Sequence, residues 1–446
     1  MHRFLHWPVV IVLMGILGTG ALAQKYEIYT KTLGNGLDVI VISNPIVPLV
    51  TIEIDVKNGA YTEPPEYDGL SHLYEHMFFK ANKAIPNQEK YLERLRELGA
   101  RWNGTTSDER VNYFITVPRE NLEAGLEFMY NAITSPLFLE EELIKERPVV
   151  NGEYDRNEAN PYFHLGRAVN QKVWWKYFSR KNVIGDREII MTTTPEKMRT
   201  IQNRFYIPNN SALILAGDIS AEEGFALAEK YYGSWTAGED PFAKFPVPEH
   251  PAIEKTETIV IEKPVNAVGL MMVWQGPSVS KDPKATYAAD VLSFISRQQT
   301  SKFTKNLVES GLAYGASLGY YTLNHTGPIT LFAQTSPEKY QDLQKAVDAE
   351  LKQMAADDYF TDDQLENAKT ILAIDEQYGR EKPSDFAHTV GFWWAVAGLD
   401  YYYNYIENLN QVTRDDIKRY LNTYIIDQNH ITGVLVAPDQ RAKLGI

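Results

Sequence analysis

The amino-acid sequence predicts a duplicated α/β protein with two homologous half-domains of roughly 200 residues each. Strand-like and helix-like segments recur in the same order on both sides of a proline-rich stretch, Thr236–His250. The segment TPEKMRTIQNRFYIPNNSALILAGD, which starts at Thr194, also aligns with TRDDIKRYLNTYIIDQNHITGVLVAP, which starts at Thr413. Both segments are typical of a helix, a turn and a buried strand. Because the identities are few, two unrelated α/β domains remain the alternative.

Each element of the first half follows from a local pattern. Two strand-like runs flank the turn Asn35–Gly36, and a third strand follows at 49–56. The segment 69–80, GLSHLYEHMFFK, has a helical pattern, and 88–98 places Leu92, Leu95 and Leu98 on one helix face before Gly99 ends it. A strand is predicted at 109–118, and another helix begins near Glu120.

The second half repeats this order. Strands are predicted at 256–264 and 267–276, a helical region begins at Asp282, and a further strand lies at 327–335. Thr236–His250 contains three prolines and neither periodicity, which indicates a linker. The predicted organisation is therefore an N-terminal domain at 24–235, a linker at 236–255 and a C-terminal domain at 256–446.

The first 23 residues are typical of a cleavable signal peptide. Arg3 precedes the short apolar run Val9–Leu17, and Ala21-Leu22-Ala23 fits a small-residue cleavage site. The run is too short to span a bilayer comfortably, although an uncleaved N-terminal anchor is the alternative. No later segment has 18 consecutive apolar residues, so we expect a mature chain without a membrane span.

Composition narrows the chemistry. The chain has no cysteine, which excludes disulfides and thiolate metal sites, so any metal must be held by histidine and carboxylate ligands. An exported protein without disulfides favours the bacterial periplasm. The formal net charge of −14 makes nucleic acid an unfavourable partner.

The motif with the clearest chemistry is H-x-x-E-H at positions 72–76. On a helix, His72 and His76 lie one above the other, so both imidazoles can reach one zinc ion. Glu75 lies beside them and can act as a base on a zinc-bound water that attacks a peptide carbonyl. The alternative is a helix with two structural histidines. The remaining histidines of the mature chain lack such spacing and are interpreted as structural or surface residues: His164, His250, His325, His388 and His430.

A catalytic zinc needs a third protein ligand, and the segment EEELIKERPVVNGEYDRNEANP supplies Glu146 and Glu153. Here the sequence resembles the pitrilysin/insulinase family of inverted zincins, in which a glutamate ligand follows the second histidine by 77 positions, as Glu153 follows His76. An acidic residue seven positions before that ligand is also usual, and Glu146 fits. Pro148 departs from a regular helix and predicts a kink or a new helix start between the two glutamates.

The resemblance covers the whole mature chain and is greatest to half-length members related to mitochondrial processing peptidase. It implies an α+β fold of the processing-peptidase/LuxS-like metallohydrolase type, with two half-domains of mixed, mainly antiparallel sheets flanked by helices. It also implies one zinc ion per chain held by His72, His76 and Glu153, with Glu75 as general base and Glu146 supporting the site.

The segment ARWNGTTSDERVNYFITVP resembles the family's edge strand beside the metal, to which a substrate peptide adds by backbone hydrogen bonds. By that match Asn103, Gly104 and Thr105 would line the cleft, and Asn103 would help to hold the scissile carbonyl. The alternative is a plain hairpin that turns at Asn103–Gly104.

The second half has no H-x-x-E-H. Where the family often has R-E-K-G-L-A-Y, with an arginine and a tyrosine that bind substrate and stabilise the oxyanion, this chain has VESGLAY. Tyr314 is kept, but Val308 stands in place of the arginine, and Arg297 lies too far upstream to replace it. The alternative for Tyr314 is a packing aromatic.

The sequence and the resemblance together predict a periplasmic zinc metalloendopeptidase that cuts short or unfolded peptides inside a chamber between two chains. The missing arginine favours a heterodimer with a homologous subunit that lacks H-x-x-E-H and carries the arginine and tyrosine; a homodimer is the alternative. A non-catalytic assembly or binding subunit of the same fold is the competing function.

Overall fold

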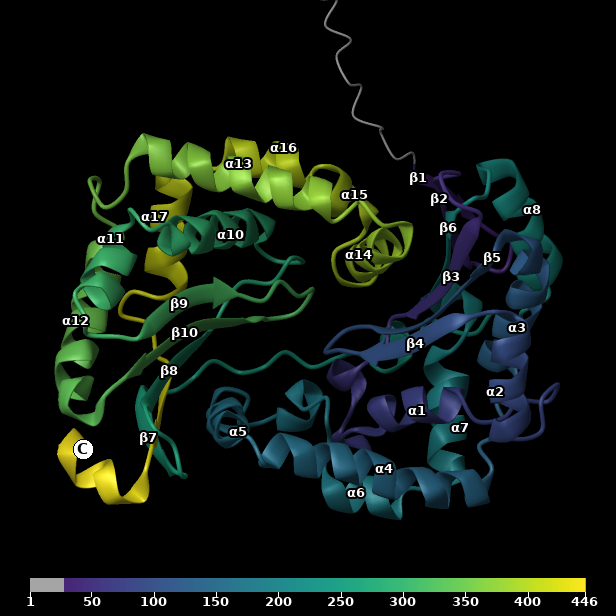
Figure 1. Cartoon of the computed structure of the whole chain (residues 1–446), viewed down its shortest axis with the longest axis horizontal. Coiled ribbons are helices and arrows are strands. Elements are labelled where there is room, and N and C mark those ends of the chain that lie inside the picture. The colour runs from purple at the N-terminus through teal and green to yellow at the C-terminus, as the bar shows by residue number, and fades with distance from the viewer. Residues whose placement is uncertain (1–27, 446) are drawn as a thin grey trace, which may run out of the picture.

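The computed structural model describes residues 28–445 and contains two mixed β-sheets, each flanked by helices (Figure 1). This confirms the predicted α+β class with two half-domains. The predicted signal peptide lies outside the described residues. Within 28–445, no helix combines the length and the apolar character needed to cross a membrane.

The N-terminal sheet has six strands in the order β1-β2-β6-β3-β5-β4. Its β2 and β6 are parallel, and its other neighbours are antiparallel. The strands are β1 (Ile28–Thr32), β2 (Asp38–Ser43), β3 (Leu49–Val56), β4 (Arg101–Thr106), β5 (Val111–Pro118) and β6 (Ser211–Gly217).

The C-terminal sheet has five strands in the order β7-β11-β8-β10-β9. Its only parallel pair is β7 with β11, at the place that β2 and β6 occupy in the first sheet. The two sheets therefore share one topology, as a duplication predicts. The strands are β7 (Glu257–Glu262), β8 (Val268–Gln275), β9 (Gly315–Tyr320), β10 (Pro328–Thr335) and β11 (Ile431–Val436).

The helices also follow one order in both halves. In the N-terminal half they are α1 (Leu70–Phe78), α2 (Gln88–Glu97), α3 (Leu122–Thr134), α4 (Glu140–Glu158), α5 (Pro161–Val173), α6 (Arg187–Thr192), α7 (Pro195–Phe205), α8 (Ala221–Tyr232) and, in the predicted linker, α9 (Pro241–Lys244). In the C-terminal half they are α10 (Pro283–Arg297), α11 (Lys302–Thr304), a π-helical turn (Lys305–Glu309), α12 (Tyr340–Gln353), α13 (Asp362–Tyr378), α14 (Pro383–Val396), α15 (Leu399–Tyr403), α16 (Tyr405–Gln411) and α17 (Arg414–Tyr424).

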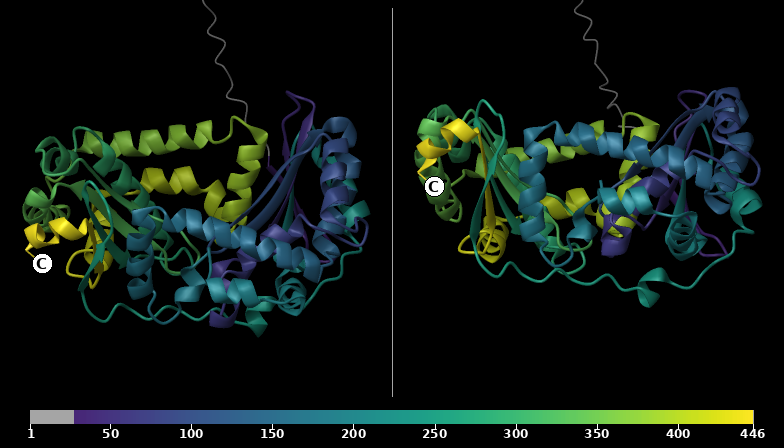
Figure 2. Two further views of the ribbon diagram at one scale, coloured as in Figure 1. Left: turned by 60° about the horizontal axis from the view of Figure 1, so that its bottom comes forward. Right: turned by 90° about the horizontal axis from the view of Figure 1, so that it is seen from below.

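One face of each sheet packs on helices of its own half, and the other face packs on a helix of the opposite half (Figures 1 and 2). Phe386 and Val390 of α14 pack on Ile40 and Ile214 of the N-terminal sheet. In the reciprocal contact, α5 packs on β8 and β11 of the C-terminal sheet. Each buried apolar side chain of this size contributes about 1.5–3 kcal/mol, so the exchange joins the halves tightly. The predicted domain boundaries stay a prediction.

A new helix start at Pro148 and the alternative of a hairpin turn at Asn103–Gly104 are both wrong. Helix α4 runs unbroken through Pro148, which lies on its exposed side, where water can satisfy the carbonyl that proline leaves unpaired. The hairpin does not turn at Asn103–Gly104: both residues lie inside β4, and the turn is at 107–110.

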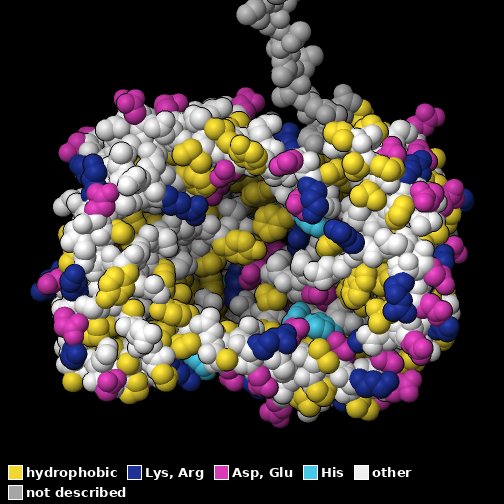
Figure 3. Space-filling view, viewed as in Figure 1, with side chains coloured by type: hydrophobic (Ala, Val, Ile, Leu, Met, Phe, Trp, Pro, Cys, Tyr) yellow, Lys and Arg dark blue, Asp and Glu magenta, His cyan; other side chains and the backbone are white. Residues whose placement is uncertain are grey.

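A hollow separates the two halves on the face shown in Figure 3, and histidine and carboxylate side chains lie at its border. The two long helices α4 and α13 run along opposite sides of this space (Figures 1 and 2).

Candidate metal centre

Helix α1 presents its polar residues on one side. Leu73, Tyr74 and Met77 are buried in the N-terminal core, which leaves His72, Glu75 and His76 partly exposed on the opposite side. This follows from the 3.6-residue period of the helix. The motif thus lies on a helix that is fixed by its apolar face.

The start of α1 is held by Glu63. Its buried carboxylate accepts the N–H groups of Gly69, at 2.7 Å, and Ser71, at 2.5 Å, two donors that a helix start otherwise leaves without partners. Gly69 has φ +88°, and a Cβ there would lie 2.4 Å from the Cα of Gly185, so only glycine fits this approach.

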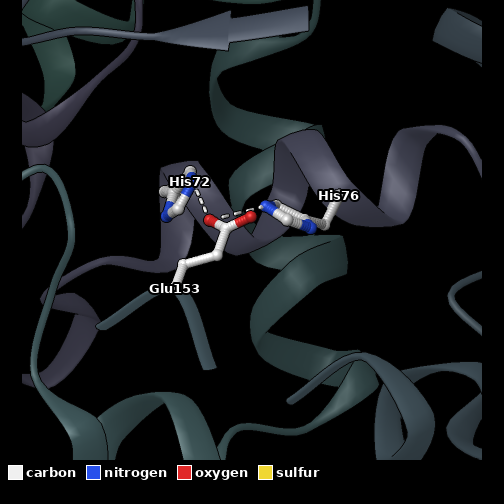
Figure 4. A group of neighbouring side chains, drawn as sticks. All are labelled: His72, His76 and Glu153. Carbon is white, nitrogen blue, oxygen red and sulfur yellow. Dashed lines mark ion pairs between the residues drawn. The ribbon is translucent and has the colours of Figure 1, made fainter. Parts of the chain in front are cut away.

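Helix α4 brings Glu153 to the two histidines (Figure 4). One carboxylate oxygen of Glu153 lies 3.5 Å from Nε2 of His72 and 3.6 Å from Nε2 of His76. Ligand atoms on a tetrahedral zinc, each about 2.1 Å from the ion, are about 3.4 Å apart. The three side chains therefore fit the ligand set of one zinc ion, and their ligand atoms all lie within 4.8 Å of one another.

Glu146 orients His76. Its carboxylate lies 2.8 Å from Nδ1 of His76, which leaves Nε2 free to face Glu153. The other oxygen of Glu146 pairs with Lys80, whose side chain is nearly buried. Sequence reasoning did not find Lys80, since a lone lysine four residues after His76 has no pattern that points to the site.

The pKa values of the two imidazoles shift in opposite directions. Burial, with the neighbouring His76, lowers the pKa of His72 to about 4, so that His72 is neutral at pH 7 and available as a ligand. Burial also acts to lower the pKa of His76, but the hydrogen bond to Glu146 and the charge of Glu153 raise it on balance. A proton therefore competes with a metal more strongly at His76 than at His72.

Glu75 lies between α1 and the edge strand β4. Burial raises the pKa of its carboxyl group, and one of its oxygens accepts a 2.7 Å hydrogen bond from Thr106. Thr106 was missed by sequence reasoning, because only the fold brings it to α1. A Cβ on Gly104 would lie 2.9 Å from Cγ of Glu75, so the backbone of β4 passes directly over this carboxylate.

Among residues 28–445, strand β4 pairs with β5 alone, and no strand lies along its other edge. The Ser107 N–H bonds the Arg110 carbonyl, so alternation along the antiparallel ladder bonds Thr105 and Asn103 to β5. The N–H and C=O groups of Trp102, Gly104 and Thr106 then point to the free edge. The side chains of Asn103 and Thr105 lie on the face opposite Glu75, and their lining role stays a prediction.

Tyr314 lies in the other half, immediately before the edge strand β9, and its side chain is 65% exposed. That exposure argues against a packing role. Within residues 28–445, no hydrogen bond or ring contact joins Tyr314 to His72, His76 or Glu153. Val308 packs against the C-terminal core, and the guanidinium of Arg297, on α10, lies over the ring of Phe294.

Two family profiles match the chain. The profile of Insulinase (Peptidase family M16) matches residues 38–186, which include His72, His76 and Glu153. The profile of Peptidase M16 inactive domain matches residues 192–372. An uncharacterised zinc protease of Rickettsia felis is 25% identical over 378 residues, which cover 84% of this chain and 89% of the relative.

Solved structures show the same fold. A protease from Helicobacter pylori has a TM-score of 0.82 at 22% identity and covers 92% of this chain and 100% of that one. The periplasmic protease PqqL from Escherichia coli has a TM-score of 0.75 at 20% identity and covers 94% of this chain but 48% of that one. With these matches along both halves, the chain belongs to peptidase family M16, the insulinase family.

Proposed function

We propose that the chain is a zinc metalloendopeptidase that hydrolyses short or unfolded peptides. His72, His76 and Glu153 would hold the zinc ion, and Glu75 would be the general base. The observation that carries the proposal is the placement of one Glu153 oxygen at 3.5 and 3.6 Å from the two Nε2 atoms. The zinc-protease name of the Rickettsia relative supports the same activity.

The residues of the chain divide the chemistry between them. A bound zinc ion polarises the scissile carbonyl and lowers the pKa of water to about 7. Glu75 accepts the proton of the attacking water and passes it to the leaving amide nitrogen. Its raised pKa favours that proton transfer, and the Thr106 hydrogen bond holds the carboxylate in position.

A substrate peptide would add to the sheet at the free edge of β4. The outward N–H and C=O groups of Gly104 lie beside Glu75, so a substrate residue paired there would have its carbonyl near the metal ligands. Recognition through the backbone tolerates many side chains and requires an extended, unfolded segment.

Pairing with a second chain and location in the periplasm belong to the same proposal. PqqL is about twice as long as this chain, which supports a working unit of two such chains. The absence of a cation at Val308 favours a homologous partner that supplies arginine and tyrosine. The periplasmic location of the Escherichia coli protease PqqL supports an export of this chain by the predicted signal peptide.

The test replaces Glu75 by Gln and compares the purified variant with the wild type. We expect zinc content to stay at one ion per chain while cleavage of an unstructured peptide falls by a factor of about 10³ or more. A chelator should abolish wild-type cleavage, and added zinc should restore it. A folded wild-type chain that binds no zinc would instead favour the non-catalytic assembly role.

A further inference from the structure

The turn between β4 and β5, residues 107–110, is held by the C-terminal half. Glu109 is 2% exposed, and its carboxylate accepts the N–H groups of Asn324, at 2.7 Å, and His325, at 2.9 Å. The same carboxylate lies 2.8 Å from Nδ1 of His325. Asn324 and His325 belong to the loop that joins β9 to β10. One buried side chain thus makes three hydrogen bonds across the two halves.

The residues on either side of Glu109 are anchored as well. Asp108 lies 3.7 Å from the amine of Lys181, which in turn donates to the carbonyl of Thr326 at 3.0 Å. Arg110 donates to the carbonyl of His388, on α14, at 2.8 Å and pairs with Asp55 at 3.3 Å. The turn therefore has contacts with two separate segments of the C-terminal half.

A row of side chains across the sheet leads to the same helix. Thr105 of β4 donates to Asn112 of β5, Asn112 donates to the buried Glu53 of β3, and Glu53 pairs with His388 of α14. His325 and His388, which the sequence predicts to be structural or surface residues, both contact carboxylates that connect to β4.

These anchors bear on the active site because β4 is an edge strand. With a neighbour on one side only, it has half the backbone hydrogen bonds of an inner strand and opens more easily. Thr106, which bonds Glu75, directly precedes the anchored turn. A displacement of the turn would move both the Thr106 hydroxyl and the free edge of Gly104.

We propose that Glu109 is a positioning residue through which the C-terminal half holds β4 in place beside Glu75. This inference rests on the proposed peptidase function. The half that lacks the metal ligands then has a defined task in the reaction: its Asn324–His325 loop fixes the strand that would receive the substrate.

The test compares Glu109→Ala and His325→Ala with the wild type. Glu109→Ala removes all three bonds, whereas His325→Ala removes only the imidazole contact and keeps both backbone donors. Glu123→Ala is the matched control, because Glu123 makes an exposed ion pair with Lys230 inside the N-terminal half. Zinc content, amide hydrogen exchange of residues 101–106, and kcat and KM for an unstructured peptide are measured for each protein.

We expect Glu109→Ala to keep its zinc, to exchange the amides of Asn103 and Thr105, which are bonded to β5, at least tenfold faster, and to lose about 10- to 100-fold in kcat/KM through both constants. His325→Ala should lie between Glu109→Ala and the wild type, and Glu123→Ala should match the wild type. If Glu109→Ala does not fold, the His325→Ala measurement decides.

Unchanged β4 exchange in a folded Glu109→Ala protein would overturn the proposal, as would unchanged kcat/KM. A wild-type protein that cleaves no peptide would instead contradict the peptidase function. In that case the exchange of residues 101–106 still decides whether Glu109 holds the strand.

Discussion

At the scale of single residues, the orientation of His76 depends on two buried charged side chains, Glu146 and Lys80. Glu146 contacts both Nδ1 of His76 and the amine of Lys80, and the side chains of Glu146 and Lys80 are less than a tenth exposed. Burial acts to raise the pKa of Glu146, but the hydrogen bonds from His76 and Lys80 lower it on balance, so the group is ionised at neutral pH. An ionised partner strengthens the imidazole as a donor to a metal.

We therefore expect Glu146→Gln to weaken zinc binding by about 10- to 100-fold, since the neutral amide no longer balances the imidazole or Lys80. Competition with a zinc-binding dye measures the affinity. Glu141→Gln, an exposed position on the same helix, is the control. Equal zinc affinities for wild type and Glu146→Gln would show that the contact does not support the ligand.

Protonation of His250 makes the stability of the folded protein depend on pH. Burial and the nearby cations Lys181 and Arg180 lower its pKa to about 3. Between that value and the unfolded value of about 6.5, the unfolded chain binds a proton that the folded chain does not. Stability therefore falls as pH drops through this window, by at most about 1.4 kcal/mol for each pH unit from this group.

The variant His250→Phe keeps an aromatic ring against Trp174 and removes the proton site. We expect its free energy of unfolding, measured with urea between pH 7 and pH 4, to fall less steeply than that of the wild type. His164→Asn, on the exposed part of α5, should follow the wild type. Parallel curves for wild type and His250→Phe would contradict the assignment.

The sequence was sufficient to predict those residues of the candidate metal site whose spacing carries information. His72, Glu75 and His76 lie within one helical turn, and Glu153 was found from a family spacing. Glu63, Lys80 and Thr106 were missed. Each acts through a single contact made by the fold, and a lone glutamate, lysine or threonine has no periodic or spaced pattern that would single it out.

At the scale of elements, β4 lies close to α1 because Gly104 has no side chain. The Cβ of an alanine at position 104 would lie 2.9 Å from Cγ of Glu75, 3.1 Å from Cε2 of Phe79 and 3.2 Å from the carbonyl of Asn112. All three are closer than ordinary van der Waals contact, so either the strand or the carboxylate has to shift.

We expect Gly104→Ala to keep its zinc and to lose about 10- to 100-fold in kcat/KM, because a small displacement at the reacting groups is costly. Gly166→Ala is the matched control. Nothing lies within 4 Å of a Cβ at this position inside α5, so activity should stay unchanged and stability should rise by about 0.5–1 kcal/mol. Steady-state kinetics measure the activity, and thermal unfolding measures the stability. Wild-type kinetics in Gly104→Ala would show that β4 can shift without loss of activity.

The order of helices and strands could be predicted from periodicity, but the partner of each helix could not. Helix α14 was not predicted from the sequence, and its buried side, which includes Phe386, Val390 and Trp394, packs on the N-terminal sheet and not on the sheet of its own half. A kink or a new helix start was expected at Pro148, but no new helix starts there, because proline on the exposed side of a long helix costs one hydrogen bond that water replaces. Tertiary packing decided both cases.

At the scale of the whole molecule, the two halves form one structural unit. Helix α14 covers Ile40, Ile42 and Ile214 of the N-terminal sheet, and Leu165 and Val169 of α5 cover the C-terminal sheet. The hollow on the face shown in Figure 3 is consequently framed by elements whose positions depend on both halves. The linker alone would let the halves separate, whereas the exchanged helices fix their spacing.

This arrangement predicts that neither half folds well alone. A chain of residues 24–245 lacks α14 and exposes the apolar face of its sheet, and a chain of residues 246–446 lacks α5 and does the same. We expect each fragment to aggregate or to bind a hydrophobic dye when it is produced separately. Co-expression should give a 1:1 complex that binds zinc, since the contacts made by α5 and α14 do not require a continuous linker.

Size-exclusion chromatography and zinc analysis of the separate and combined fragments measure this. An N-terminal fragment that is monomeric, unfolds cooperatively and binds zinc by itself would show that the helix exchange contributes little to the fold.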